Sequence, residues 1–340
     1  MRIGIVNDVM LATAALRRVV AATPGHETAW TAATGAEAVQ RAAADPVDLI
    51  LMDLIMPQMD GVEATRRIMK QSPCAILVVT STVTGHLDMV YEAMSLGALD
   101  AIQTPVLGLS GNIDGAAALQ DKLAIIAKLI GRNGRAPRVN GAAAVTALTE
   151  EAPLVAIGAS TGGPQAVSEI LQALPADLPA SVVIVQHVDE HFATGLAEWL
   201  SRRCARRVLP ARQGDRLGAG KIFIAAGPDH LVIESNGRLG YTPEPKESSY
   251  KPSVDAFFMS AARRRGMRGC AILLTGMGRD GADGLLTLRK AGFHTIAQDQ
   301  KTSVVWGMPK AAAEIGAAVD VLPLPAIGAR ALRAIKELHP

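Results

Sequence analysis

The stretch Ile157–Pro164, IGASTGGP, decides how the second half of the chain is expected to fold. The apolar run Leu154–Ile157 leads into it and predicts a buried strand. Apolar residues recur behind it at the spacing of a helix: Val167, Ile170, Leu171 and Leu174. Pro164 suits the first helical position, where no amide hydrogen is needed. Ser160 is therefore expected at a strand-to-helix turn, where free helix amides stabilise developing negative charge.

Three interpretations of this turn are compatible with its residues. The segment from Gly158 to Gly162 fits G-x-S-x-G, the nucleophile elbow of α/β-hydrolases. A glycine-rich turn between strand and helix also suits a phosphate, although the spacing matches neither G-x-G-x-x-G nor the Walker pattern. The third interpretation is a structural turn in which Ser160 caps the helix. The turn alone does not choose among them, because short patterns recur by chance.

Length and composition narrow the class of protein. With 340 residues, the chain is long enough for two domains that each bury a core. The formal net charge of +2 gives no argument for nucleic acid or an anionic membrane as a partner. The three cysteines have no metal or disulfide spacing, which favours a reducing compartment and predicts a cytoplasmic protein. The apolar N-terminus is too short for a signal peptide, and no apolar run approaches the ~20 residues of a membrane span.

Residues 1–131 alternate between strand-like and helix-like patterns, which predicts an α/β domain with a parallel sheet covered on both faces. The expected strands are Ile3–Val6, Val47–Met52 and Ala75–Val79. Asp8, Asp53 and Thr80 follow these strands, at the edge where doubly wound sheets bind ligands. Two carboxylates near a hydroxyl suit Mg²⁺, which prefers oxygen ligands and would neutralise a phosphoryl group on Asp53. The simpler alternative is a set of solvated loop acids.

The run Met52–Gly61, MDLIMPQMDG, resembles the phosphoacceptor motif of response-regulator receiver domains, M-D-x-x-M-P-x-M-D-G. The later run Gly97–Asp100 fits the same family's G-A-x-D. This resemblance implies a flavodoxin-like, doubly wound receiver in which Asp53 is phosphorylated. It also implies that Asp8, Asp53 and the carbonyl of Ile55 bind Mg²⁺, with Thr80 as the switch hydroxyl.

Three positions depart from the receiver pattern. Asn7 stands where the family's acidic pair usually begins. Thr104, before Pro105, replaces the lysine that contacts the phosphoryl group, and Ala101 lies where the switch aromatic is expected. We expect Asp53 to accept a phosphoryl group despite these changes, with a weaker conformational response.

The periodic pattern disappears from about Gly131 to Ala152, which predicts a linker over residues 132–152. A second α/β domain is expected over residues 153–337. In it, the run Ser181–Gln186 predicts a strand that ends at His187, and Cys270–Leu274 predicts another that leads to Asp280.

Ser160, His187 and Asp280 each follow a predicted strand, so a single sheet edge can bring them together. Ser–His–Asp chemistry requires such a meeting, because the histidine takes the hydroxyl proton and the carboxylate fixes the imidazole. Two alternatives involve other histidines. The run His187–His191 fits the zinc motif H-x-x-E-H, but its first histidine closes a strand instead of lying on a helix. The order Ser…Asp…His of α/β-hydrolases would recruit His294, which the pattern places in a buried strand.

Several runs of the second half resemble the catalytic domain of CheB-type chemotaxis methylesterases. They are residues 156–164 (AIGASTGGP), 185–187 (VQH), 251–255 (KPSVD), 274–282 (LTGMGRDGA) and 307–309 (GMP). The order of receiver, linker and catalytic domain is that family's own. Asn7-Asp8 and Thr104 further resemble its Wsp-type branch, which regulates surface sensing.

The resemblance implies a three-layer α/β/α domain with a mostly parallel sheet. It implies hydrolysis of glutamate methyl esters on chemoreceptor-like proteins, and in many members deamidation of receptor glutamines. Ser160 would be the nucleophile, His187 the base and Asp280 its orienting partner, with the amides of Thr161 and Met277 as the oxyanion hole. No cofactor is expected for the esterase reaction.

The resemblance also implies regulation, in which the receiver covers the catalytic edge until a CheA-type histidine kinase phosphorylates Asp53. Neither nucleic-acid binding nor membrane insertion is expected. The main alternative is a receiver that acts as a phosphate sink or adaptor beside a vestigial esterase domain. The intact triad of Ser160, His187 and Asp280 argues against that alternative. A small-molecule esterase is a further alternative, which the sequence alone leaves open.

Overall fold

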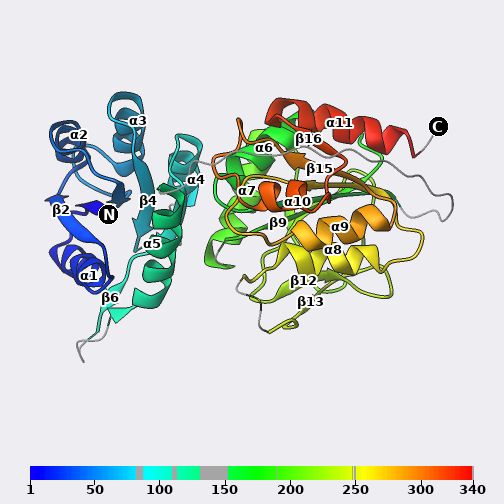
Figure 1. Ribbon diagram of the computed structural model, residues 1–340, viewed down its shortest axis with the longest axis horizontal. Helices are drawn as coiled ribbons and strands as arrows, with labels where there is room; N and C mark the ends of the chain where they lie inside the picture. The colour runs from blue at the N-terminus through cyan, green and yellow to red at the C-terminus, as the bar shows by residue number, and fades with distance from the viewer. Residues whose placement is uncertain are drawn as a thin grey trace. The chain divides into compact units, whose positions relative to one another are not determined.

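The computed structural model describes residues 1–81, 87–108, 113–130, 152–188, 190–246, 248 and 250–338. The chain divides into two compact units, Met1–Gly134 and Arg135–Pro340 (Figure 1). The predicted linker, residues 132–152, lies outside the described residues except for Ala152. The predicted domain boundaries therefore stay predictions, and each unit is described by itself.

The first unit is a five-stranded parallel sheet in the order β2-β1-β3-β4-β5. The strands are β1 (Arg2–Val6), β2 (Glu27–Ala32), β3 (Leu49–Met52), β4 (Ala75–Thr80) and β5 (Asp100–Gln103). The helices are α1 (Met10–Ala21), α2 (Gly35–Ala44), α3 (Gly61–Gln71), α4 (Leu87–Ser95) and α5 (Ala116–Ile130). A short antiparallel pair, β6 (Val106–Leu107) and β7 (Ile113–Asp114), precedes α5. This is the doubly wound, flavodoxin-like fold that the sequence predicts.

The sheet of the first unit is apolar along its central strands because helices cover both faces. Helices α1 and α5 pack together on one face, whereas α2, α3 and α4 pack in a row on the other (Figure 1). The core on the first face joins the strands to both helices through Ile3, Ile5, Leu16, Leu49, Leu51, Leu77, Leu119 and Leu123. Strand β3 begins at Leu49, two residues later than expected, because Pro46 to Asp48 form the approach to the sheet.

The second unit is a seven-stranded sheet in the order β10-β11-β9-β8-β14-β15-β16. Its strands are β8 (Leu154–Ala159), β9 (Ser181–Gln186), β10 (Val208–Pro210), β11 (Ile222–Ile224), β14 (Gly269–Leu273), β15 (His294–Gln298) and β16 (Asp320–Leu322). Every strand pair within this sheet is parallel. A separate antiparallel hairpin consists of β12 (His230–Ile233) and β13 (Leu239–Thr242).

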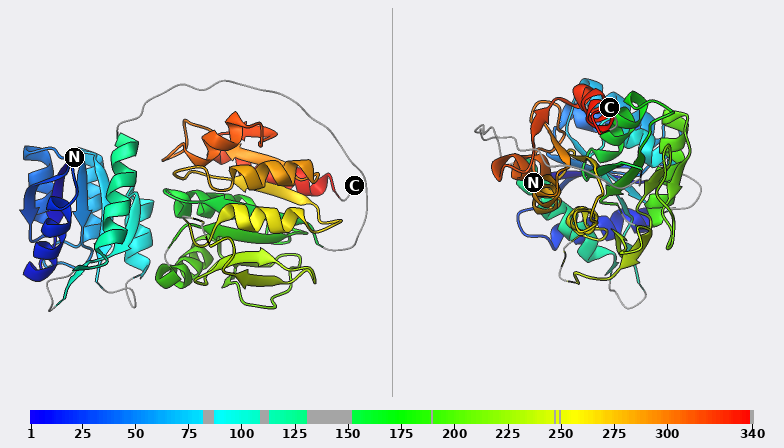
Figure 2. Two further views of the ribbon diagram at one scale, coloured as in Figure 1. Left: turned by 60° about the horizontal axis from the view of Figure 1, so that its bottom comes forward. Right: turned by 90° about the vertical axis from the view of Figure 1, so that its right-hand side faces the viewer.

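Helices cover both faces of the second sheet and give the predicted three-layer arrangement (Figures 1 and 2). One layer holds α6 (Gly163–Ala173), α7 (Glu190–Cys204) and α11 (Leu324–Lys336). The other holds α8 (Val254–Ala262), α9 (Ala282–Lys290), α10 (Met308–Glu314) and the β12–β13 hairpin. Because all strands run the same way, the residues that follow them gather at one edge of the sheet.

Two details of the second unit differ from, or add to, the sequence analysis. Helix α6 begins at Gly163, so Pro164 occupies its second position instead of its first. Either place tolerates proline, because the first four helical amides have no carbonyl partner within the helix. Among the described residues, no helix is long and apolar enough to cross a lipid bilayer.

Candidate active site

Ser160 and His187 lie next to each other at the carboxyl edge of the second sheet. Strand β8 runs between β9 and β14, and its register pairs Ala159 with Gln186. Ser160 and His187 are the residues that follow this last pair. Backbone hydrogen bonds continue past the strand ends, from the His187 amide to the Ala159 carbonyl (3.0 Å) and from the Ser160 amide to the Thr275 carbonyl (3.0 Å). The central strands thus fix both residues through the main chain.

The turn after Ser160 is shaped by two glycines and one glutamine. Gly162 precedes α6 with φ +75°, a left-handed conformation that glycine adopts without strain. A Cβ on Gly163 would lie 2.0 Å from Oε1 of Gln186, so only glycine fits against that amide. Nε2 of Gln186 donates to the Ser160 carbonyl (2.8 Å). Because Gly162 is the N-cap and no side chain caps the helix, the interpretation of Ser160 as a helix cap is wrong.

His187 and Asp280 form a direct buried pair. Nε2 of His187 lies 2.7 Å from Oδ2 of Asp280, and the two residues are 9% and 8% exposed. A carboxylate can only accept, so Nε2 carries the proton of the neutral imidazole. Nδ1 is buried and has no hydrogen-bond partner among the described residues. The structure therefore joins His187 to Asp280, while the bond that would link Nδ1 to Ser160 is not made.

Asp280 is surrounded by donors from the start of α8. Its Oδ1 accepts from the hydroxyl of Ser253 (2.8 Å) and from the amide of Asp255 (3.1 Å). Its Oδ2 accepts from the amide of Val254 (2.6 Å) in addition to His187. Burial raises the pKa of Asp280, but the bond and charge of His187 and the other donors outweigh it, so the pKa lies below its ordinary value. Asp280 is held ionised with its orientation fixed.

Two backbone amides near the ends of β8 and β14 have no protein acceptor among the described residues. Within the described chain, the amides of Thr161 and Met277 donate to no protein acceptor. The hydroxyl of Thr275 ties their loops together, because it donates to the Thr161 carbonyl (2.9 Å) and accepts from the Val305 amide (2.9 Å). These amides are where the sequence analysis expects an oxyanion hole.

Sequence reasoning missed several residues that build this site. Tyr250 stacks on the ring of His187, Ser253 binds Asp280, and Gln186 and Thr275 hold the turn of Ser160. A sequence signal for Ser253 did exist, because a serine before the apolar run of α8 predicts a helix N-cap. Its hydroxyl does accept from the Ala256 amide. The stacking of Tyr250 has no sequence signal.

His294 takes no part in this group. It is the first residue of β15 and therefore lies at the opposite edge of the sheet from Ser160. Its Nε2 contacts Oδ2 of Asp320 at 2.7 Å, and Arg330 lies 3.3 Å from its Nδ1. Burial lowers the pKa of His294 more than Asp320 raises it. The sequence-based placement of His294 in a strand is confirmed, and its ring belongs to a structural network.

The zinc interpretation of residues 187–191 meets a geometric obstacle. His187 follows strand β9, and α7 begins only at Glu190, so the two histidines of the motif do not share one helix. The side chain of His191 lies outside the described residues. The one described ligand candidate, His187, already uses Nε2 to bind Asp280.

The predicted phosphoacceptor, Asp53, lies at the carboxyl edge of the first sheet and is 6% exposed. Its Oδ1 accepts from the Leu54 amide (2.7 Å), and its Oδ2 accepts from the side-chain amide of Asn7 (2.9 Å). Burial raises the pKa of Asp53 to about 6, and the charge of Asp8 adds to this while the amides of Leu54 and Ile55 oppose it. Its ionised form is therefore destabilised in the folded unit.

The residues predicted to bind Mg²⁺ fit such an ion. Asp8 and Asp53 are close enough for their charges to interact, and a cation would relieve both that repulsion and the burial of Asp53. No three His, Cys, Asp or Glu side chains gather into a metal site within the described ranges. A magnesium site here would thus rest on two carboxylates and the Ile55 carbonyl, with water completing the shell.

The two predicted switch residues stand side by side. The amide of Thr104 donates to the carbonyl of Thr80 (2.9 Å), and the residues are 4% and 1% exposed. The hydroxyl of Thr104 has no hydrogen-bond partner in the described part of the chain. Ala101 lies half-buried in β5, where it presents no aromatic ring.

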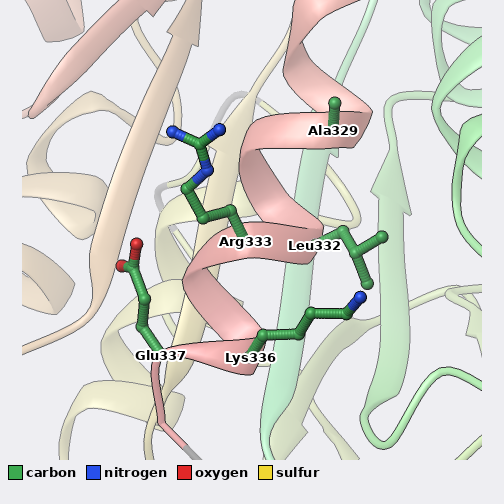
Figure 3. Close-up of a pocket in the computed structure, with 5 residues that line it drawn as sticks. All are labelled: Ala329, Leu332, Arg333, Lys336 and Glu337. Carbon is green, nitrogen blue, oxygen red and sulfur yellow. The ribbon is translucent and has the colours of Figure 1, made fainter. Parts of the chain in front are cut away.

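A shallow cavity of about 400 Å³ lies elsewhere, on the surface of α11 (Figure 3). It is lined by Ala329, Leu332, Arg333, Lys336 and Glu337. Helix α11 follows β16 and returns to the amino-terminal edge of the sheet, so its last turns lie away from Ser160. The cavity contains none of the predicted site residues.

Comparison with known proteins assigns both units. Residues 155–331 match the CheB methylesterase family, and residues 3–107 match the response regulator receiver domain. A protein-glutamate methylesterase/protein-glutamine glutaminase of Mesorhizobium japonicum is 52% identical over 98% of both chains. This chain belongs to the CheB methylesterase family.

Two further relatives support the assignment to this family. A protein of Cupriavidus metallidurans with the same description, numbered 2, is 53% identical over 97% of both chains. The crystal structure of the CheB methylesterase catalytic domain of Thermotoga maritima is 34% identical, with a TM-score of 0.51. It covers 54% of this chain and 98% of that domain. The CheB fold therefore extends through the second unit, whereas the first unit is its receiver.

Proposed function

We propose that this protein is a phosphorylation-regulated protein-glutamate methylesterase that uses Ser160, His187 and Asp280. The observation that carries the proposal is the buried His187–Asp280 pair, in which Nδ1 has no partner among the described residues and whose backbone follows the same strand pair as Ser160. Membership of the CheB family and the printed names of its relatives supply the substrate class, a glutamate methyl ester on a chemoreceptor-like protein.

In the proposed reaction, Nδ1 of His187 takes the hydroxyl proton as Oγ of Ser160 attacks the ester carbonyl. The C–O bond to the methoxy group then breaks, and the imidazolium returns the proton so that methanol leaves. Water attacks the acyl-serine by the same route and releases free glutamate. Relative to the usual Ser–His–Asp arrangement, the two ring nitrogens exchange roles, since here Nε2 faces the carboxylate.

The amides of Thr161 and Met277 are proposed to bind the oxyanion of the tetrahedral intermediate. They are free of protein acceptors in the described residues, and Thr275 fixes the loops that carry them. Donors held in place before the reaction need no reorganisation when charge develops. The same machinery would release ammonia from a receptor glutamine, and the relatives' second name, protein-glutamine glutaminase, supports that side activity.

The receiver is proposed to regulate this reaction through Asp53. A CheA-type histidine kinase would supply the phosphoryl group, and Mg²⁺ held by Asp8, Asp53 and the Ile55 carbonyl would neutralise its charge. The unphosphorylated receiver, assigned to residues 1–131, would restrain the catalytic domain at 153–337 through the linker at 132–152. Removing residues 1 to about 140 is then expected to raise the basal esterase rate.

A cytoplasmic site of action agrees with three cysteines that are all free. The likeness to the Wsp-type branch stays a prediction.

The test is methanol release from a methylated chemoreceptor by the full-length chain. Ser160→Ala is expected to lower kcat by several orders of magnitude while the fold survives, because only the oxyanion hole and binding remain. Ser168→Ala is the matched control, since this serine is buried on α6 but lies outside the group. A wild-type chain that accepts phosphate yet releases no methanol would favour the adaptor alternative. Activity on small esters alone would favour a small-molecule esterase.

A further inference from the structure

The imidazole of His187 lies flat against the ring of Tyr250, with centroids 4.3 Å apart and planes only 6° apart. Tyr250 belongs to the segment between β13 and α8. We propose that Tyr250 is a positioning residue for His187, and that His230 anchors the segment that carries Tyr250. This inference rests on the proposed function, because it assigns a role within the same site.

The need for such a residue follows from how His187 is bonded. Its ring makes one side-chain hydrogen bond, from Nε2 to Asp280, while Nδ1 has no partner among the described residues. One hydrogen bond fixes the position of Nε2 but leaves the imidazole ring of His187 free to rotate about that atom. Such a turn would move Nδ1, the atom proposed to take the proton of Ser160. A parallel aromatic face restrains that motion, because rings stacked with centroids 4.3 Å apart collide when one of them tilts.

Tyr250 is itself placed against the loop of the proposed oxyanion hole. A Cβ on Gly278 would lie 2.8 Å from the Tyr250 hydroxyl oxygen, so the tyrosine reaches from His187 to the residue after Met277. Gly278 has φ +79°, which favours glycine and lets the main chain approach the ring closely. One side chain thus contacts both the base and the loop that carries the Met277 amide.

His230 makes hydrogen bonds to residues on both sides of Tyr250 in the sequence. It is fully buried, with 0% exposure. Its Nδ1 accepts from the Ser253 amide (3.0 Å), so its Nε2 must carry the proton that it donates to the Pro245 carbonyl (3.1 Å). The hydroxyl of Ser253 in turn donates to Asp280. One neutral imidazole therefore joins Pro245 to Ser253, which lie on either side of Tyr250 in the sequence, and Ser253 is the residue that donates to Asp280.

Stacking also favours the charged state that the reaction needs. When His187 takes the proton of Ser160, it becomes an imidazolium, and an aromatic face attracts a cation. The effect depends on the ring of residue 250 and not on its hydroxyl. Tyr250→Phe, which keeps the ring, should therefore preserve most of the function, whereas Tyr250→Leu replaces the planar face with a smaller aliphatic side chain.

The experiment compares these two variants in the full-length chain, with kcat and KM measured separately on methylated receptor. Tyr250→Phe is expected to keep kcat within about threefold. Tyr250→Leu is expected to lower kcat roughly 10- to 100-fold, the scale of about 1 Å of misplacement, with KM unchanged. The ring-proton resonances of His187 should lose their upfield shift in Tyr250→Leu alone. This resonance test reports stacking whether or not the esterase proposal holds.

Several results would overturn the inference. They are an unchanged kcat in Tyr250→Leu, an equal loss in Tyr250→Phe, and a change confined to KM, which would make Tyr250 a substrate contact. A wild-type chain as inactive as Ser160→Ala would instead contradict the proposed function, so the two failures are distinguishable. Two further variants test the role of His230 as an anchor. His230→Gln keeps one donor and one acceptor, so its kcat should be higher than that of His230→Leu. If His230→Leu fails to fold, restored activity in His230→Gln still supports the anchor, and its absence opposes it.

Discussion

Asp53 directly follows β3 in the first sheet and Asp280 lies in the loop between β14 and α9 in the second, and their surroundings shift their pKa values in opposite directions. Both follow buried strands, and Asp280 and Asp53 are 8% and 6% exposed. Asp280 accepts from one imidazole, one hydroxyl and two amides, and its pKa is lowered despite burial. Asp53 accepts from the Leu54 amide, from the side chain of Asn7 and, at 3.5 Å, from the Ile55 amide, but burial together with the charge of Asp8 raises its pKa to about 6.

The difference between Asp280 and Asp53 shows that the pKa of a buried carboxylate depends on the hydrogen-bond donors around it. A carboxylate that must orient a histidine in every turnover is fully provided with donors, so it stays ionised and rigid. The carboxylate proposed to receive a cation and a phosphoryl group accepts fewer and longer hydrogen bonds. Binding these partners then relieves a cost that folding has imposed, which couples the chemistry of Asp53 to its surroundings.

The largest effect is expected from Asp280→Asn, which removes the carboxylate of the His187–Asp280 pair. The four groups around Asp280 are all donors, so the amide of asparagine would face at least one of them unfavourably. The imidazole would also be driven towards the wrong tautomer, and kcat is expected to fall by about 10³–10⁴. Methanol release measures this loss, with circular dichroism as the check on folding.

Asp255→Asn is the matched control for this prediction. Asp255 is also a partly buried acid beside the site, and burial raises its pKa to about 6. Its carboxylate accepts from the Gly284 amide (2.6 Å), and in the described part of the chain it makes no hydrogen bond to His187 or Ser160. It should keep most of the activity. Equal losses in the two variants would mean that charge near α8, and not the bond to His187, is what matters.

The second prediction concerns the other aspartate. Asp53→Asn should abolish activation by a phosphodonor, because the acceptor oxygen is gone, while the basal esterase rate remains. Asp60→Asn is the control, since Asp60 caps α3 through the Glu63 amide (2.8 Å) and asparagine caps equally well. The readout is the ratio of esterase rates with and without a small-molecule phosphodonor. Activation that persists in Asp53→Asn would move phosphorylation to another residue.

Much of this arrangement was predictable because parallel strands leave strong local signals. Runs such as Ser181–Gln186 are apolar on both faces and are followed by polar residues, so the edge that gathers Ser160, His187 and Asp280 follows from the pattern. Edge strands were harder. Strand β2, Glu27–Ala32, is partly exposed along its length and has no continuous apolar run, so it was not predicted.

The parts that could not be predicted depend on distant contacts. Ser253 and Asp280 are 27 positions apart, and only the fold shows that the start of α8 supplies the donors of the carboxylate. The choice of Nε2 over Nδ1 as the partner of Asp280 depends on ring orientation, which no sequence pattern encodes. The stacking of Tyr250 on His187 likewise needs coordinates.

The third prediction concerns Thr104 and the response to phosphorylation of Asp53. Thr104 is buried beside Thr80, and its hydroxyl has no partner within the described residues. A lysine here would place a cation against the phosphoryl group, and a charged hydrogen bond contributes about 1.5–3 kcal/mol. Thr104→Lys should increase the ratio of phosphorylated to unphosphorylated esterase rates. Thr104→Met, of similar length without charge, is the control. An unchanged or smaller ratio in the lysine variant would show that this receiver couples by another route.

The last and smallest effect is the pH dependence of the first unit's stability. The pKa of Asp53 is about 6 when folded, above its ordinary 3.8, so the folded state binds more protons than the unfolded state between these values. Stability must then fall as pH rises from about 4 to 6, and remain lower above that. Discounted for solvent screening, the loss is about 1–2 kcal/mol.

Asp53→Asn lacks this titration, so the difference in unfolding free energy between variant and wild type should grow in the variant's favour between pH 4 and pH 7. Any constant cost of the substitution cancels in that comparison. The indole resonance of Trp30, whose Nε1 donates to the Asp45 carbonyl (2.9 Å), reports unfolding of the first unit alone in urea. A difference that stays constant with pH would show that Asp53 is solvated like an ordinary surface acid. The contrast with Asp280 would then rest on hydrogen bonding alone.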